Sequence, residues 1–200
     1  MFLIQTTDYF YPLINDPYKM GWIACNNVIS DMYAMGCTRI DNVLMLLATS
    51  TKFSSIEDEI VIPMIMSGFR DCCFAAGTQV RGGQTARNPW VLLGGCATSV
   101  LPREKFIMPT GAKIGDVLIL TKPLGTQVAV NLHQWDDIEK ERLEKLSIKT
   151  EQIKKAYDDS TISMMTLNKA AAKLMVELNG KDIKGTPISS VWVSGLWFLG

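Results

Sequence analysis

The residues best suited to chemistry in the first part of the chain are short side chains that carry oxygen. Asp8 comes at the exit of a predicted strand, Ile4–Thr7, where side chains on a rigid element commonly meet ligands. Asn27 and Asp31 lie four residues apart in a predicted helix, so their side chains point the same way. Such donors suit a compact polar ligand, for example a hydrated metal ion or a phosphate. The alternative, a helix packed on another polar element with Asp31 in solvent, stays open.

The predicted helix that carries these two residues has an unusual polar face. Pro17 fits its first position, with Asn15 or Asp16 as the cap, and the helix is expected to end between Asp31 and Gly36. A solvated helix face normally carries Lys and Glu, whose long side chains suit water. Here the polar arc holds only short side chains, namely Asn26, Asn27, Ser30 and Asp31.

A second candidate site is a predicted loop made of Gly82, Gly83, Gln84 and Thr85. Adjacent glycines let backbone N–H groups approach a ligand closely, and such loops cradle phosphates. Arg81 and Arg87 flank the loop and are placed to pair with phosphate oxygens. The spacing from Gly77 to Gly82 resembles a P-loop, but glycine at position 83 stands where that motif requires lysine, which excludes a Walker A site. A plain tight turn is the open alternative.

The composition is that of an ordinary globular chain without a dominant charge. Twenty Lys and Arg balance twenty Asp and Glu among 200 residues, so we expect neither nucleic acid nor membrane as a partner. The five cysteines lack metal-type spacing and no signal peptide is evident, which favours free thiols in a reducing, cytoplasmic setting. His133, the single histidine, lies among apolar helix residues and is predicted to pack rather than to act as a base.

Local patterns predict an α/β (α+β) order of elements that positions the candidate sites. The apolar run Asp41–Thr49 is predicted to be a buried central strand. Ser54 and Glu57 form a capping signal for a helix that should run to Ala76 and stop at Gly77. The further predicted elements are strands at 78–80, 89–100 and 115–121 and helices at 126–135, 137–146 and 150–178.

Three finer predictions concern packing and the division of the chain. Gly94 and Gly95 are predicted to mark a bulge in the strand at 89–100. The connector 101–112, which contains two prolines and a glycine, is the predicted domain boundary. The residues of the second helix that are predicted to face the core are Ile60, Met64, Ile65, Gly68, Phe69, Cys72 and Cys73.

Four motifs in register resemble a single enzyme family. They are Gln5–Asp8, Ala24–Gly36, Gly82–Thr85 followed by Asn88–Trp90, and Leu120–Ala129. Together they are similar to selenophosphate synthetase (selenide, water dikinase) in its animal form, within the aminoimidazole-ribotide-synthetase-like ATP enzymes. The likeness covers about residues 3 to 178 in order and without large gaps.

The resemblance implies a kinase-like transferase that converts selenide, ATP and water to selenophosphate, AMP and phosphate. It implies ATP as substrate, selenide or a related small anion as second ligand, and several Mg²⁺ ions. Asp31 matches a family aspartate that binds Mg²⁺, and Asp8 matches one that contacts the nucleotide site. Gly82, Gly83, Gln84 and Thr85 match a loop that touches the nucleotide, in the family often across the interface of a homodimer.

The departures from the family pattern shape the expected activity. We expect the chain to begin downstream of the family's reactive Cys or selenocysteine, its catalytic lysine and a Gly-x-Asp metal-binding strand, so no catalytic residue is assigned. We therefore expect low or absent dikinase activity, with weak binding of the magnesium nucleotide. Downstream, the likeness is expected to fail near Asn179, where Asp182 is a faint echo of a metal-binding aspartate. The tail 180–200 is expected not to be native family sequence.

These predictions combine into one architecture with alternative functions. Residues 1–110 are expected to form an ATP-binding synthetase-like N-terminal domain, with a mixed or antiparallel sheet and packed helices. Residues 111–179 are expected to open a second α/β domain. The alternative function is a non-enzymatic dimerisation partner or regulator, in a homodimer or in a heterodimer with a full-length paralogue. A third alternative is an ATP-dependent synthetase acting on a formyl or amide substrate, which the motifs favour less.

Overall fold

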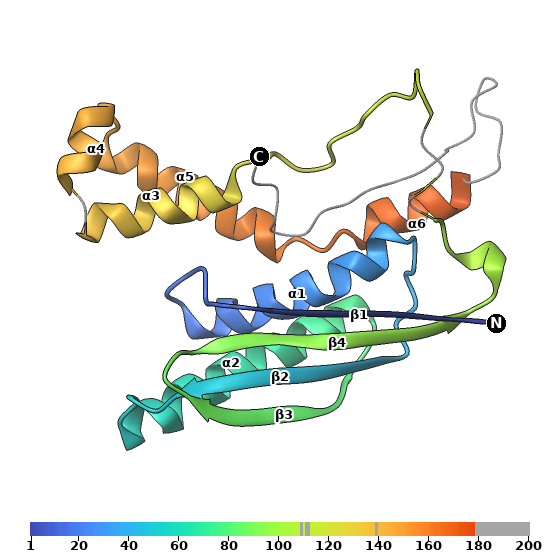
Figure 1. Cartoon of the computed structure of the whole chain (residues 1–200), viewed down its shortest axis with the longest axis horizontal. Coiled ribbons are helices and arrows are strands. Elements are labelled where there is room, and N and C mark those ends of the chain that lie inside the picture. Colours follow the sequence, from blue (N-terminus) through green and yellow to red (C-terminus); the bar gives the residue numbers. More distant parts are fainter. Residues whose placement is uncertain (109, 111–112, 139, 179–200) are drawn as a thin grey trace.

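The computed structural model describes residues 1–108, 110, 113–138 and 140–178, which form a mixed α/β fold around one four-stranded sheet (Figure 1). The strand order is β1-β4-β2-β3. β4 runs antiparallel to both β1 and β2, whereas β2 and β3 are parallel. The strand bounds are Phe2–Phe10 for β1, Asn42–Ser50 for β2, Val80–Asn88 for β3 and Leu92–Leu101 for β4.

Two long helices, α1 (Pro17–Ala34) and α2 (Ser55–Ala76), pack against one face of the sheet, and the main core lies between them and the strands. The predicted α/β class and the central position of β2 are confirmed. The second half of the described chain is helical apart from an extended connector (Figure 1). Its elements are the short 3₁₀ turn Arg103–Lys105, then α3 (Thr126–Ile138), α4 (Lys140–Leu146), α5 (Thr150–Met165) and α6 (Lys169–Leu178).

Local capping signals fix the ends of α1 and α2 as the sequence predicts. The carboxylate of Asp16 accepts the backbone N–H of Lys19 at 3.0 Å. Ser54 and Glu57 form a reciprocal capping box at the start of α2, with distances of 2.8 and 3.3 Å. Gly77 ends α2 in the left-handed conformation at φ 79°, which glycine adopts without steric cost.

The crossing of α1 and α2 is unusually close because each helix presents a glycine to the other. A Cβ placed on Gly21 would lie 1.9 Å from the carbonyl oxygen of Ile65. A Cβ placed on Gly68 would lie 1.8 Å from the carbonyl oxygen of Tyr18. No side chain fits in that space, so the two backbones are in direct contact at this crossing.

The inner face of α2 is narrower than predicted. Ile65, Phe69 and the adjacent thiols of Cys72 and Cys73 are buried as expected. The prediction is wrong for Ile60 and Met64, which are 54% and 39% exposed. At 100° per residue Ile60 and Met64 fall at one edge of the predicted arc, outside the narrower arc of buried residues that runs from Gly68 to Cys73.

The glycine pair in β4 does not form the predicted bulge. The pairing of β4 with β1 and with β2 is continuous through Gly94 and Gly95. Instead, the irregularity lies between β2 and β3, where Val43 pairs with Val80 and Leu44 with Gly82. Arg81 is therefore the extra residue of a bulge, a position at which a strand turns a side chain out of the regular alternation.

Residues 115–121 do not form the predicted strand, although they are extended. The apolar side chains of this run are almost fully exposed, from 69% for Leu120 to 95% for Leu118. A strand needs a neighbour for its backbone hydrogen bonds, and within the described residues none pairs with this run. The apolar pattern predicts burial correctly only when a partner element is present.

The predicted helix at 150–178 is two helices. The break is the segment Thr166-Leu167-Asn168, between α5 and α6. The first residue of α5 is Thr150, and Lys149 occupies its N-cap position. Leu174 is 54% exposed, whereas Met164, Ala172 and Met175 are buried.

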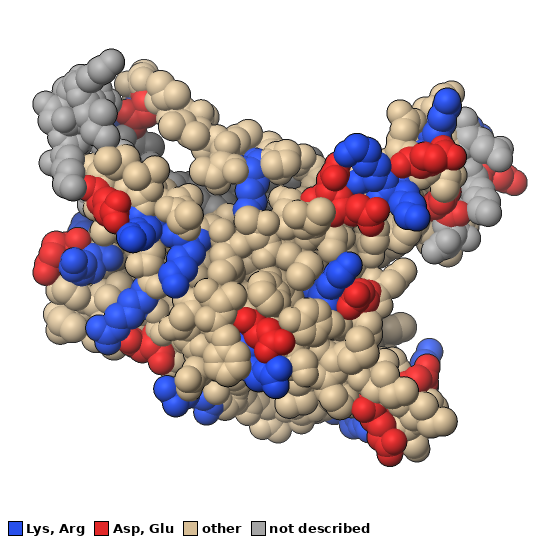
Figure 2. Space-filling model, turned by 180° about the vertical axis from the view of Figure 1, so that it is seen from behind, with Lys and Arg blue, Asp and Glu red and all other residues tan. Residues whose placement is uncertain are grey.

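The face of the sheet away from α1 and α2 carries exposed side chains. Leu3, Tyr9 and Val100 project from it and are 66%, 44% and 41% exposed. Figure 2 shows the molecule from the side opposite to Figure 1, with charges of both signs interspersed over a largely uncharged surface. No helix in the described part of the chain has the length and apolar character needed to cross a membrane.

The buried thiol of Cys37 predicts alkaline instability. Burial raises its pKa from 9.0 to about 12, so above pH 9 the folded chain keeps a proton that the unfolded chain loses. Stability is unaffected below pH 9 and falls as the pH rises from 9 to 12. At pH 10.5 this one thiol lowers the free energy of unfolding by about 2 kcal/mol.

Urea titrations at pH 8 and pH 10.5 measure this loss. Cys37→Ala should lose about 2 kcal/mol less than the unmodified chain between the two pH values. Cys96→Ala, which removes a half-buried thiol from β4, should behave like the unmodified chain. An equal loss in all three proteins would contradict the assignment.

Candidate functional site

β1 and α1 bring the two candidate aspartates together. Side chains alternate along β1, so Thr6 and Asp8 share the face that lies against α1. The hydroxyl of Thr6 donates to Oδ2 of Asp31 at 2.9 Å, and Nδ2 of Asn27 donates to Oδ2 of Asp8 at 2.5 Å. Four short polar side chains from a strand and a helix therefore form one cluster, which we call the acidic pair site.

The acidic pair site brings two carboxylates close enough to interact electrostatically. The pKa of Asp8 is raised, first by burial and then by the nearby charge of Asp31. Hydrogen bonds from Asn27 and from the backbone N–H of Tyr9 oppose this rise in part. Since two carboxylates repel each other here, a bound cation would stabilise the site.

The donor set of the acidic pair site fits Mg²⁺ that is shared with a phosphate. Mg²⁺ prefers oxygen ligands and is usually held by one or two carboxylates, with water and substrate phosphates completing its shell. Asp8 and Asp31 supply the carboxylates, and Thr6 and Asn27 hold them in place. Among the described residues no group of three or more His, Cys, Asp or Glu side chains is placed to hold a metal ion.

The other two members of the polar arc on α1 have a structural role. Nδ2 of Asn26 donates to the carbonyl oxygens of Met164 at 2.6 Å and Thr166 at 3.0 Å. Nδ2 of Asn168 donates to the hydroxyl of Ser30 at 3.1 Å. The alternative of a helix packed on another polar element is therefore correct for Asn26 and Ser30, which anchor the break between α5 and α6.

Lys122 completes this anchor, a role that the sequence patterns did not reveal. Its ammonium donates to the carbonyl oxygen of Ser163 at 3.0 Å and also to that of Thr166. The indole N–H of Trp22 donates to the carbonyl oxygen of Met165 at 2.8 Å. Burial lowers the pKa of Lys122 to about 8. The last carbonyls of α5, which have no partner within a helix, are thus satisfied by side chains from distant segments.

Gly82, Gly83, Gln84 and Thr85 lie away from the acidic pair site. The prediction of a loop is wrong, because all four belong to β3, and Gly83 takes a φ of 140° that only glycine adopts readily. β3 and β1 are the two opposite edges of the sheet (Figure 1). Three strand spacings, roughly 14 Å, therefore separate these residues from Asp8 of the same chain.

The remaining candidate residues have definite positions or lie outside the described residues. Arg87, one of the two arginines next to the glycine pair, forms an ion pair with Asp58 and donates to the carbonyl oxygen of Ser50 at 3.2 Å. His133 stacks on Tyr157 with ring centroids 3.8 Å apart, which agrees with the prediction that it packs against other residues. Asp182 and the predicted tail 180–200 lie outside the described residues.

Comparison with known proteins gives consistent matches. Residues 1–101 match the family model of the AIR synthase related protein, N-terminal domain. The chain is 56% identical over 187 residues to selenide, water dikinase 3 of Danio rerio, which covers 92% of this chain and 42% of that protein. It is 54% identical over 187 residues to selenide, water dikinase 2 of Homo sapiens, again over 92% of this chain and 42% of that protein. These matches confirm the resemblance that the four motifs predict.

A third relative extends the match beyond the predicted limit. The chain is 46% identical over 198 residues to the probable selenide, water dikinase of Caenorhabditis elegans. This alignment covers 99% of the chain and 50% of that protein, so it reaches into 180–200. The prediction that the likeness ends near Asn179 is therefore wrong. The chain spans about half the length or less of the relatives it matches.

Solved structures share the fold. Thiamine monophosphate kinase from Aquifex aeolicus superposes with a TM-score of 0.66 at 17% identity, over 88% of this chain and 56% of that one. The Aquifex enzyme complexed with AMPPCP and TMP gives a TM-score of 0.65 at 17% identity, over 88% and 53%. At such identity the likeness concerns the fold alone.

Proposed function

The chain belongs to the AIR synthase related family, and from that premise we propose that it is the Mg²⁺–nucleotide-binding portion of a selenide, water dikinase. The proposed reaction converts ATP, selenide and water to selenophosphate, AMP and phosphate. The proposal is supported by relatives named selenide, water dikinase at 46% to 56% identity. The observation that carries it is the convergence of Asp8 and Asp31, which come from separate elements yet share one hydrogen-bonded cluster.

The proposed roles follow from the position of each side chain. Asp31 is the exposed member of the pair and is proposed to coordinate Mg²⁺ directly. Asp8 is half-buried, is held by Asn27, and is proposed to orient the metal-bound nucleotide. A bound Mg²⁺ would screen the phosphates and stabilise charge that develops on a transferred phosphoryl group. The chain's own residues fix where that ion sits.

We propose that Gly82, Gly83, Gln84 and Thr85 contact the nucleotide of a second copy of the chain in a homodimer. They lie at the β3 edge, on the side of the sheet order opposite to β1 and Asp8 of the same chain. Exposed side chains on the sheet face away from α1 and α2, and two sheet edges that pair with no further strand among the described residues, support such an assembly. All five cysteines are free, which supports the proposal of a reducing, cytoplasmic location.

The test is a thermal unfolding titration of the chain with ATP in the presence of Mg²⁺. Mg²⁺-ATP is expected to raise the unfolding midpoint in a saturable manner, because a ligand that binds only the folded state stabilises it. ATP with EDTA and Mg²⁺ alone are the controls and should give much smaller shifts. A shift of the same size with EDTA, or no shift at millimolar Mg²⁺-ATP, would refute the proposed role of the acidic pair site.

A further inference from the structure

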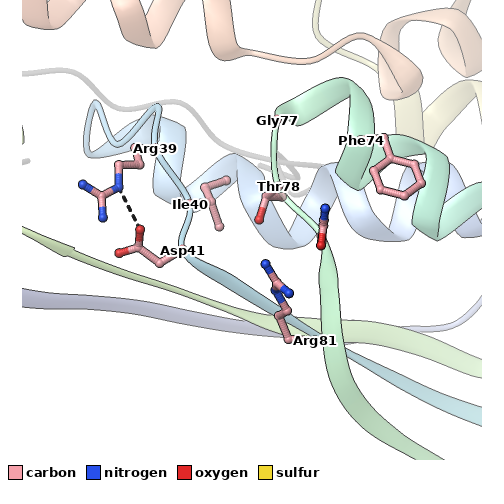
Figure 3. A pocket seen from close by; sticks show the side chains of 8 residues that line it. Arg39, Ile40, Asp41, Phe74, Gly77, Thr78 and Arg81 are labelled. Carbon is pink, nitrogen blue, oxygen red and sulfur yellow. Dashed lines mark hydrogen bonds and ion pairs between the residues drawn. The ribbon is translucent and has the colours of Figure 1, made fainter.

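A cavity of about 450 Å³ lies at the start of β3, and none of its lining residues belongs to the acidic pair site (Figure 3). Its lining includes Arg81 of β3, the edge strand opposite to β1. Arg39 comes from the segment between α1 and β2, and Arg81 comes from the bulge at the start of β3. The complete lining is Arg39, Ile40, Asp41, Phe74, Gly77, Thr78, Gln79 and Arg81.

The charge of this cavity is positive on balance. Nε of Arg39 donates to Oδ1 of Asp41 at 2.8 Å. The other oxygen of Asp41 accepts the backbone N–H of Val100 at 2.9 Å and the hydroxyl of Ser99 at 3.4 Å, so this carboxylate is occupied and its pKa is lowered. Arg81 has no ion pair with any residue that the structure describes. Two guanidinium groups therefore face one carboxylate that is already engaged.

Thr78 supplies a hydroxyl without a partner. Its side chain is 7% exposed, and Oγ1 is buried with no hydrogen-bond partner among the described residues. In Figure 3 this oxygen points toward the space between Ile40 and Arg81. A buried hydroxyl without a partner costs free energy, and a ligand atom that accepts its proton would remove that cost.

The end of α2 does not repel an anion from this cavity, although a helix carboxyl terminus is normally negative. The carbonyl oxygen of Phe74 accepts the N–H of Gly77 at 2.9 Å. The ammonium of Lys169 donates to the carbonyl oxygen of Ala76 at 2.7 Å and lies 3.2 Å from the Cβ position of Gly77. The helix end is thus covered by a third cation beside the cavity.

Phe74 gives the cavity an apolar wall. Its ring lines the cavity and is 55% exposed, which is unusual for so large an apolar side chain. In Figure 3 the ring stands on α2, while Arg81 reaches in from β3. The ring, Arg39 and Arg81 line the same cavity, and this combination of an aromatic wall and guanidinium groups matches a ligand that has a planar aromatic body and an anionic group.

We propose that this cavity binds a phosphate monoester with an aromatic body, of the nucleoside monophosphate class. Arg81 and the free N–H groups of Arg39 pair with the phosphate oxygens, and Thr78 donates its hydroxyl to the same group. The aromatic body packs on Phe74. The site needs no metal ion and does not depend on the acidic pair site.

The test is calorimetric titration of the chain with AMP and with inorganic phosphate, both in EDTA. AMP is expected to bind saturably and at least tenfold more tightly than phosphate. Arg81→Gln should weaken AMP binding at least tenfold, because it removes a charge-assisted pair. Phe74→Ala should reduce AMP affinity to that of phosphate. Circular dichroism spectra verify that each variant is folded.

Two further variants serve as controls. Arg70→Gln removes an exposed arginine of α2 that pairs with Asp71 outside the cavity, and should bind AMP normally. Asp31→Asn should also bind AMP normally in EDTA, whatever its effect on Mg²⁺-ATP. The proposal is overturned if AMP does not bind at millimolar concentration, if Arg81→Gln binds like the unmodified chain, or if Asp31→Asn abolishes AMP binding. Equal affinity for AMP and phosphate would overturn the proposal that the ligand has an aromatic body that packs on Phe74.

Discussion

Asp31→Asn is expected to abolish the thermal stabilisation that Mg²⁺-ATP gives to this chain. At a ligand concentration one hundred times Kd, binding contributes about 2.7 kcal/mol to the folded state, and the variant should lose nearly all of it. The amide keeps an oxygen that accepts from Thr6 but cannot offer the metal a charged ligand. The measurement is the unfolding midpoint with Mg²⁺-ATP and with EDTA.

The same variant should unfold at a slightly higher temperature than the unmodified chain in EDTA. Asp31 raises the pKa of Asp8, so at neutral pH the two carboxylates repel, and the amide relieves this repulsion. Relative to the unmodified chain, the unfolding midpoint of Asp31→Asn should be lower with Mg²⁺-ATP and slightly higher in EDTA. This pair of results distinguishes a residue that binds the ligand from one that only supports the fold. Asp159→Asn, an exposed acid of α5 paired with Lys155, is the matched control and should leave the response to Mg²⁺-ATP unchanged. A full response to Mg²⁺-ATP in Asp31→Asn would exclude this residue as the ligand.

Gly68→Ala is expected to destabilise the fold by about 3 kcal/mol or more. A Cβ at this position would lie 1.8 Å from the carbonyl oxygen of Tyr18 and 2.8 Å from its carbonyl carbon. These atoms belong to the backbone of α1, so the two helices would have to separate, which opens the core on both sides. Urea denaturation followed by circular dichroism measures the loss.

The sign of the result is decisive for Gly68. In the interior of an exposed helix, Ala is about 1 kcal/mol more favourable than Gly. If α1 did not contact α2 at this position, Gly68→Ala would therefore stabilise the fold. Ser67→Ala, at the neighbouring half-buried position of α2, is the control and should change stability little. If Gly68→Ala is as stable as the unmodified chain, the direct contact of α1 and α2 is wrong.

The sequence predicts those features that depend on nearby residues. Ser54, Glu57 and Gly77 define both ends of α2 because capping is a local interaction. The polar arc of α1 is also visible in the sequence, and the structure divides it into two parts. Asn27 and Asp31 join Asp8, whereas Asn26 and Ser30 hold the break between α5 and α6.

Local sequence patterns do not predict the structural features that depend on residues distant in the chain. The run 115–121 has the composition of a strand but no neighbour to pair with among the described residues. Glycines 82 and 83 suggest a loop, yet the edge of a sheet also tolerates them. The contact of Thr6 with Asp31 joins two distant elements, although alternation along β1 already places Thr6 on the same face as Asp8. Nothing in the local pattern around Lys122 indicates that it caps α5.

The nine residues of β1 contribute both to the acidic pair site and to an edge of the sheet. One row of its side chains supplies Thr6 and Asp8, and its outer backbone edge pairs with no strand in the part of the chain that the structure describes. Any chain that adds to this edge restrains the backbone that aims Asp8. By thermodynamic reciprocity, occupancy of the site and strand addition must then alter each other's equilibrium constant by the same factor.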